Sequence, residues 1–207
     1  MTSKTCSMDY SDNNDFLAKE PREQLLQLIL DIAVVRGEVT LSSGLKANYY
    51  IDLRRVTLHH LGSPLVGHLL LDMLEDKGFI AGEDFTNIGG LTLGADPIAD
   101  AALHAASSRS MNLDAFVVRK AAKTHGMQRQ IEGPDIEGKK VVIVEDTTTT
   151  GGSPITAIEA ARKAGAEVVA CATIVDRATG AGDKIEALGV PYFSLFNLTD
   201  LGLEKQI

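Results

Sequence analysis

From about residue 85 onward, short apolar runs alternate with stretches of helical spacing, and this alternation constrains the fold more than any other feature. The runs are F-T-N-I-G-G, L-D-A-F-V-V, K-K-V-V-I-V-E, E-V-V-A-C-A-T-I-V-D and P-Y-F-S-L-F. Helices are expected between them at about 96–106, 154–164 and 183–188. Continuous apolar strands joined by helices form parallel sheets covered on both faces. The sequence therefore predicts an α/β fold with a central, mostly parallel sheet flanked by helices.

Length and composition indicate one domain. With 207 residues and 44% hydrophobic content, the chain can bury one substantial core and is short for two domains. Residues 1–15 are polar and lack periodicity, so a disordered tail is expected there. Residues 16–207 are expected to form a single domain, with small hood elements at about 20–60 over a core at about 61–207.

The hood is expected to contain a helix and a hairpin. Apolar residues follow Pro21 at helical spacing, and this pattern ends near Gly37. The next stretch, 38–56, has β-branched and aromatic residues interrupted by S-S-G, which predicts a short hairpin. A second helix is expected at 63–77, because a glycine suited to a helix C-terminus follows it.

Charge and hydropathy disfavour several classes of protein. A formal net charge of -8 and a pI near 5.1 argue against extended contact with nucleic acid. No apolar run approaches the roughly 20 residues of a membrane-spanning helix, and the N-terminus lacks the apolar core of a secretory signal. Cys6 and Cys171 form neither a disulfide framework nor a metal-binding spacing. We therefore expect a cytoplasmic protein without membrane or nucleic-acid partners.

A polar run follows the apolar residues 141–144 and contains Glu145, Asp146, four threonines, two glycines and Ser153. In an open α/β sheet, ligands bind beyond the carboxyl ends of the strands. Glycine N–H groups, hydroxyls and a helix start at Ser153 suit a phosphate, while the carboxylates suit the two hydroxyls of a ribose. The run predicts a site for a phosphorylated ribose. The structural alternative is an ordinary strand-to-helix turn with threonine capping.

A dense group of cations lies between two of the predicted strands. They are Arg119, Lys120, Lys123, His125 and Arg129, within eleven positions of an acidic chain. A solvated basic face is the usual explanation for such a run. Here, glycines and the absence of an amphipathic period favour a mobile lid. Cations on a lid suit a diphosphate leaving group, because its charge grows as the glycosidic bond breaks.

The polar run resembles the PRPP (5-phosphoribosyl 1-diphosphate) motif of type I phosphoribosyltransferases. Glu145 and Asp146 match its acidic pair, with Glu where Asp is commoner, and Thr149 and Gly151 match its threonine and glycine. The resemblance implies that the whole run contacts PRPP: Glu145, Asp146, Thr147, Thr148, Thr149, Thr150, Gly151, Gly152 and Ser153. Purine, uracil and orotate enzymes share this motif, as do regulators built on the same fold, so the motif alone leaves the base open.

The cation run narrows the choice, because R-K-x-x-K-x-H-G is similar to the catalytic loop of the orotate phosphoribosyltransferase family. The resemblance implies that Lys123 and His125 are the catalytic residues that stabilise the leaving group. It also implies that all four cations of the motif, Arg119, Lys120, Lys123 and His125, bind PRPP.

Two further segments are similar to the same family. V-T-L-S-S-G-L-K-A-N-Y-Y-I-D resembles its amino-terminal signature, which implies orotate contacts at Tyr50 and Ile51. T-I-V-D-R-A-T-G places Arg177 where the family has its orotate-binding arginine, and the resemblance adds Thr149 to the orotate contacts. An arginine fork suits a planar carboxylate, which adenine, guanine and uracil lack. The resemblance covers about 20–207 and is strongest to actinobacterial-type members.

The resemblance implies transfer of a 5-phosphoribosyl group from PRPP to orotate, giving orotidine 5'-monophosphate and diphosphate in UMP synthesis. Mg²⁺ would be bound mainly through PRPP, with no metal ligands assigned to the protein. A homodimer is implied, in which each lid closes over the partner subunit's site. Ser42, Thr92 and Leu93 depart from the family, which often has PRPP-contacting residues there, so no PRPP contact is assigned to Ser42 or to the 89–97 loop. The alternatives are a phosphoribosyltransferase for another base and a PRPP-sensing regulator that binds nucleic acid.

Overall fold

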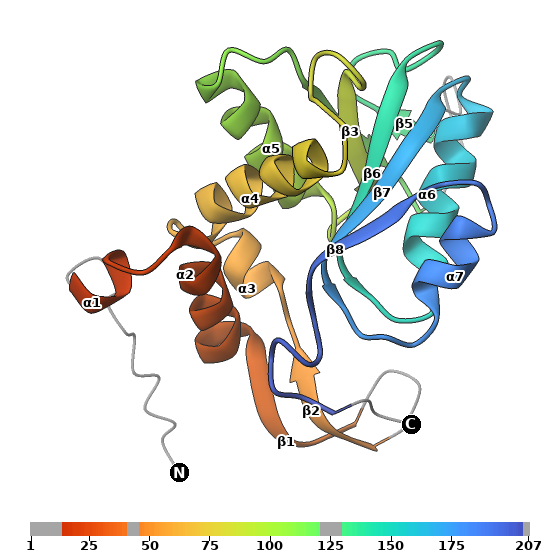
Figure 1. Cartoon of the computed structure of the whole chain (residues 1–207). Coiled ribbons are helices and arrows are strands. Elements are labelled where there is room, and N and C mark those ends of the chain that lie inside the picture. The colour runs from red at the N-terminus through yellow and green to blue at the C-terminus, as the bar shows by residue number, and fades with distance from the viewer. Residues whose placement is uncertain (1–13, 41–45, 121–129, 205–207) are drawn as a thin grey trace.

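The computed structural model describes residues 14–40, 46–120 and 130–204 of the chain (Figure 1). Its main sheet has six strands in the order β5-β4-β3-β6-β7-β8, and every neighbouring pair is parallel except β4 with β5. The strands are β3 (Asn87–Leu91), β4 (Asp114–Val118), β5 (Ile131–Glu132), β6 (Lys140–Thr148), β7 (Glu167–Asp176) and β8 (Tyr192–Asn197). The expected mostly parallel sheet is confirmed.

Helices cover both faces of this sheet (Figure 1). The elements of one face are α2 (Pro21–Leu28), α4 (Gly62–Asp76) and α5 (Asp96–Ser108), and those of the other are α6 (Gly152–Lys163) and α7 (Ala181–Glu186). Along β6, Val142 and Val144 enter the first core, whereas Val141 and Ile143 enter the second. Neighbouring strand residues point to opposite faces, so a continuous apolar strand needs cover on both.

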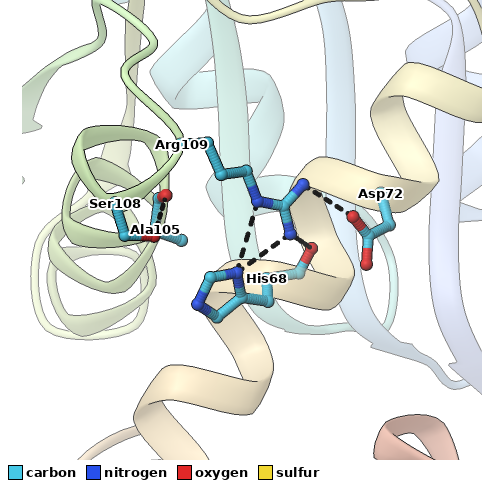
Figure 2. A network of polar contacts seen from close by, with 5 residues as sticks. All are labelled: His68, Asp72, Ala105, Ser108 and Arg109. Atoms are coloured by element: carbon cyan, nitrogen blue, oxygen red, sulfur yellow. Dashed lines mark hydrogen bonds and ion pairs between the residues drawn. The ribbon is translucent and has the colours of Figure 1, made fainter.

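The backbones of α4 and α5 lie very close together. A Cβ added at Gly67 of α4 would lie 2.2 Å from the carbonyl oxygen of Ala101 in α5. At the far end of the pair, Arg109 donates to Nδ1 and the carbonyl oxygen of His68 and to Oδ1 of Asp72 (Figure 2). A glycine contact and a polar network therefore hold this helix layer together.

The hood contains the expected hairpin. Its elements are α1 (Asn14–Leu17), the π-helix η2 (Ile29–Ala33), the antiparallel strands β1 (Val34–Thr40) and β2 (Lys46–Ile51), and α3 (Arg54–Thr57). The first long helix was expected to end near Gly37, and this was wrong. The chain is already a strand at Val34, because it pairs there with Ile51 of β2. Such pairing across the hairpin overrides the local helical spacing.

The described part of the chain starts at Asn14, and Phe16 of α1 is buried. The expected tail otherwise lies outside the described residues. At the other end, the Tyr49 hydroxyl donates to the carbonyl oxygen of Glu204, so β2 holds the C-terminal segment against the hood (Figure 1).

Strand β6 is longer than expected. The sequence predicted its end at Glu145, but pairing with β7 continues as far as Thr148, opposite Asp176. The first half of the acidic run is therefore strand and not loop, because a partner strand satisfies its backbone. The short strand β5 and the helix α3 were not expected either.

Candidate active site

A cleft of about 290 Å³ opens at the carboxyl ends of β3, β6 and β7. Pairing of β3 with β6 stops at Gly89 and Ile143, whereas β6 and β7 remain paired beyond this point. In the sheet, β3 lies between β4, the next strand along the chain, and β6. Such a place, where the strand order changes direction, is the switch point at which open α/β sheets bind ligands. The cleft is lined by Tyr50, Ile51, Asp52, Arg54, Leu91, Thr92, Leu93, Gly94, Lys120, Glu145, Asp146, Thr147, Ser153 and Arg177.

The acidic pair forms the floor of this cleft at the end of β6. Glu145 is buried and Asp146 is half-buried. The Asp146 N–H donates to Oε1 of Glu145 over 3.2 Å, and the Thr147 N–H donates to Oδ1 of Asp146 over 2.6 Å. These main-chain donors set the orientation of both carboxyl groups towards the cleft.

Gly94, in the loop after β3, lies directly against this pair. A Cβ at position 94 would lie 2.2 Å from Oε1 of Glu145 and 3.2 Å from Oδ1 of Asp146. Only glycine allows backbone to approach the carboxyl groups this closely. The backbone of the loop after β3 therefore packs directly against the acidic pair.

Burial raises the pKa of Glu145 to about 8, and the charge of Asp146 acts in the same direction. Asp96, in the first turn of α5, adds a smaller contribution of the same sign. Glu145 therefore keeps its proton near neutral pH, because burial and the neighbouring charge both disfavour its ionised form. A protonated carboxyl can both donate and accept hydrogen bonds, which matches the hydroxyls of a diol.

The loop after β3 carries local strain. Leu93 has a φ of +76° and an exposed side chain. The Asp96 carboxylate supports this turn, because its Oδ2 accepts from the Thr92 hydroxyl over 2.8 Å and from the Leu93 N–H over 3.3 Å. Strained backbone in a non-glycine residue is concentrated at functional sites. The sequence assigned no contact to this loop, yet residues 91–94 line the cleft.

The remainder of the polar run turns into α6. Gly151 has a φ of +82° at the helix N-cap, and Thr149, Thr150 and Gly152 are exposed. Thr147 and Ser153 line the cleft. The first N–H groups of a helix lack partners within the helix and suit an anion. A helix therefore starts where the sequence predicted an anion site, and the anion site itself stays a prediction.

Thr148 departs from its neighbours. Its side chain is buried, and its hydroxyl lies 3.2 Å from Oδ1 of Asp176 and 2.5 Å from the hydroxyl of Tyr192. Thr148 is not among the cleft-lining residues of the described chain, and neither are Arg119, Thr149, Thr150, Gly151 and Gly152. Of the predicted PRPP contacts that the structure describes, Lys120, Glu145, Asp146, Thr147 and Ser153 meet in the cleft.

Three of the residues expected to contact orotate meet in the cleft. Arg177 follows β7, and its guanidinium lies 5.8 Å from the ring centroid of Tyr49. Tyr50 and Ile51 of β2 line the same cleft as Arg177. The hairpin of the hood thus supplies one wall of the site, and the sheet supplies the other.

Asp52 and Arg54 also line the cleft, and the sequence analysis had not singled them out. They form an ion pair with a 2.8 Å distance from Nε to Oδ1. The available signal was the Y-Y-I-D-L-R stretch, which places charged residues directly after an apolar strand.

The two ends of the predicted lid are held together beside the cleft. The Arg119 N–H donates to the Gln130 carbonyl oxygen over 2.9 Å, and Nη1 of Arg119 contacts Oε1 of Glu132 at 3.2 Å. Lys120 lines the cleft. Lys123 and His125 lie outside the described residues, as does Ser42.

Within the described ranges, no group of three or more His, Cys, Asp and Glu side chains is arranged to hold a metal ion. No helix among those residues is long and apolar enough to cross a membrane.

A sheet of this order, with an acidic pair and the start of a helix at its switch point, is typical of one class of protein, the phosphoribosyltransferases. Residues 94–190 match the family model of the phosphoribosyl transferase domain. This segment begins at the glycine beside the acidic pair and includes β6, α6 and β7.

Individual relatives indicate a family within this class. The orotate phosphoribosyltransferase of Streptomyces avermitilis is 62% identical over 88% of this chain and 98% of its own. That of Mycobacterium tuberculosis is 52% identical over 91% of this chain and 100% of its own. The chain belongs to the orotate phosphoribosyltransferase family, whose members are enzymes of pyrimidine biosynthesis.

Solved structures agree with this assignment. The M. tuberculosis orotate phosphoribosyltransferase in complex with PRPP has a TM-score of 0.76 and 48% identity, covering 89% of this chain and 100% of that one. The adenine phosphoribosyl transferase of Trypanosoma brucei, at 12% identity, has a TM-score of 0.60 over 87% of this chain and 81% of its own, which shows the shared fold alone.

Proposed function

We propose that this chain transfers the 5-phosphoribosyl group of PRPP to orotate, giving orotidine 5'-monophosphate and diphosphate in the synthesis of UMP. One observation supports the proposal: Glu145, Asp146 and Arg177 line the same cleft. Adjacent carboxyl groups suit the hydroxyls of a ribose, and an arginine can form paired hydrogen bonds to a carboxylate. Orotate carries such a carboxylate, and other common bases do not.

The acidic pair accepts hydrogen bonds from the ribose hydroxyls of PRPP. The 5'-phosphate binds at the start of α6, where Thr147 and Ser153 line the cleft and residues 149–152 turn into the helix. Arg177 binds the orotate carboxylate, and the backbone at Tyr50 and Ile51 contacts the ring. PRPP and orotate are thereby held with the reacting atoms adjacent.

The reaction forms a bond from orotate N1 to ribose C1' while the bond from C1' to the diphosphate oxygen breaks. The transition state has oxocarbenium character, so catalysis is positional and electrostatic. Lys123 and His125 stabilise the negative charge of the leaving diphosphate, with Arg119 and Lys120 assisting. The position of Lys120 in the cleft lining supports this arrangement.

Bound Mg²⁺ would supply positive charge to the leaving diphosphate and would be held mainly through PRPP. The carboxyl groups of Glu145 and Asp146 face the cleft and could meet water molecules of such an ion. The active form is a cytoplasmic homodimer in which each lid serves the partner subunit's site.

The test is orotate-dependent release of diphosphate from PRPP in the presence of Mg²⁺. We expect turnover with orotate and none with uracil, adenine or hypoxanthine, and an Arg177→Ala variant should raise KM for orotate at least tenfold. Turnover of a purine or of uracil at comparable rates would establish a different base. Release with none of the four bases would favour a PRPP-sensing regulator.

A further inference from the structure

A short chain of hydrogen bonds lies behind the cleft and connects β6, β7 and β8. The Thr148 hydroxyl is 3.2 Å from Oδ1 of Asp176 and 2.5 Å from the hydroxyl of Tyr192. Tyr192 is at the start of β8 and is not among the described residues that line the cleft. Nothing in the reaction described above uses this tyrosine.

The direction of these bonds follows from the groups involved. A carboxylate only accepts, so Thr148 donates its single hydroxyl proton to Asp176. The short contact then requires Tyr192 to donate to Thr148. Burial raises the pKa of the Tyr192 phenol above its ordinary value, so the phenol keeps the proton that it donates. Donation therefore runs from Tyr192 to Thr148 and from Thr148 to Asp176.

This chain of hydrogen bonds ends at the backbone of Arg177. The Arg177 N–H donates to the Thr148 carbonyl oxygen over 3.0 Å. On the other side, the Ala178 N–H donates to Oδ1 of Asp176 over 3.0 Å, in a turn where Ala178 has a φ of +51°. Thr148 and Asp176 thus hold the main chain before and after the arginine that faces the cleft.

We propose that Tyr192 and Thr148 are positioning residues that set the place of Arg177 for a carboxylate-bearing acceptor, an inference that rests on the proposed function. Paired hydrogen bonds from an arginine fork to a carboxylate depend on orientation, so a small displacement of the Arg177 backbone weakens them. The residues proposed to bind the phosphate are held by main-chain pairing of β6 with β7 and by the start of α6, which a change of the Thr148 or Tyr192 hydroxyl leaves in place. Loss of the hydroxyl chain therefore weakens acceptor binding more than PRPP binding.

The variants Tyr192→Phe and Thr148→Val remove one hydrogen-bonding hydroxyl each with little change of shape. Each should raise KM for orotate roughly three- to tenfold, the value of one buried hydrogen bond, with KM for PRPP changed less than about twofold. Thr148→Ser keeps the hydroxyl and should recover most of the loss. In the double variant the two effects should not add, because both break the same chain.

Thr86→Val is the matched control. Its hydroxyl donates to Oδ1 of Asn87 at the amino end of β3, away from the cleft, so its removal should leave both KM values unchanged. The wild-type enzyme is measured first: no turnover of orotate would overturn the proposed function and this inference with it. With the wild type active, equal rises of both KM values, or an unchanged KM for orotate in Tyr192→Phe, would overturn the positioning role alone. If Thr148→Val fails to fold, Tyr192→Phe and Thr148→Ser decide the question.

Discussion

At the scale of single residues, Glu145 combines a structural cost with a proposed role in binding ribose. Its carboxyl is buried at the end of a strand, beside a second carboxyl and against the backbone of Gly94. A group in such surroundings favours its neutral form, because burial and like charge both disfavour ionisation. A position optimised for stability alone would not carry a buried acid beside a second, half-buried one.

The free energy of unfolding should depend on pH through the Glu145 carboxyl. The Glu145 carboxyl has an ordinary pKa of 4.5 and a pKa of about 8 in the folded chain. Between these values the folded state holds a proton that the unfolded state has lost, so the free energy of unfolding falls as pH rises. The slope from this one group is at most about 1.4 kcal/mol per pH unit. Glu145→Gln should flatten that fall, measured as Tm between about pH 5 and about pH 8.

Glu159→Gln is the control for this experiment, since Glu159 is an exposed carboxyl on α6. It should leave the pH profile of Tm as in the wild type. Parallel profiles for Glu145→Gln and the wild type would contradict the raised pKa.

At the scale of elements, α4 and α5 form a layer whose far end is held by Arg109. The guanidinium makes bonds to a carboxylate, a ring nitrogen and a carbonyl oxygen on α4 (Figure 2). Helix α5 begins at the cleft and ends at Arg109, so this network lies at the opposite end of the helix from the site. It therefore contributes to stability and not to binding.

Arg109→Met should lower the free energy of unfolding by about 1–2 kcal/mol, with kcat and both KM values unchanged. Asp72→Asn should cost less than about 0.5 kcal/mol, because the Asp72 side chain is 53% exposed and solvent screens its ion pair. Urea unfolding measures both. A loss of activity in Arg109→Met without a loss of stability would contradict this assignment.

At the scale of the whole molecule, the two ends of the lid lie beside the cleft of their own chain, and a shared lid requires a second subunit. We predict that Lys123→Ala and Arg177→Ala chains, each strongly impaired alone at an orotate concentration well below the raised KM of Arg177→Ala, recover activity when mixed under subunit exchange. Half of the randomly mixed dimers are hybrids with one intact site of two, so about a quarter of wild-type activity should return. No recovery, in a mixture where hybrid dimers are demonstrated, would show that the sites are not shared.

The sequence by itself predicted the class of fold, which the structure confirms, and a candidate site. Apolar runs of strand length between helical stretches leave a covered parallel sheet as the stable arrangement. The acidic pair and the glycines were predicted because their residue types suit ribose and phosphate, and Arg177 was predicted from the resemblance to the family. The identity of the family followed from the same motifs.

Tertiary structure alone decided where elements end and which side chains face the cleft. β6 extends through Thr148 because β7 supplies its hydrogen-bond partners, and the first helix gives way at Val34 because β2 does the same. The Thr148 side chain turns towards Tyr192, 44 residues away in sequence, and not towards the cleft. Local spacing carries no information about such partners, since they meet only when distant segments pack.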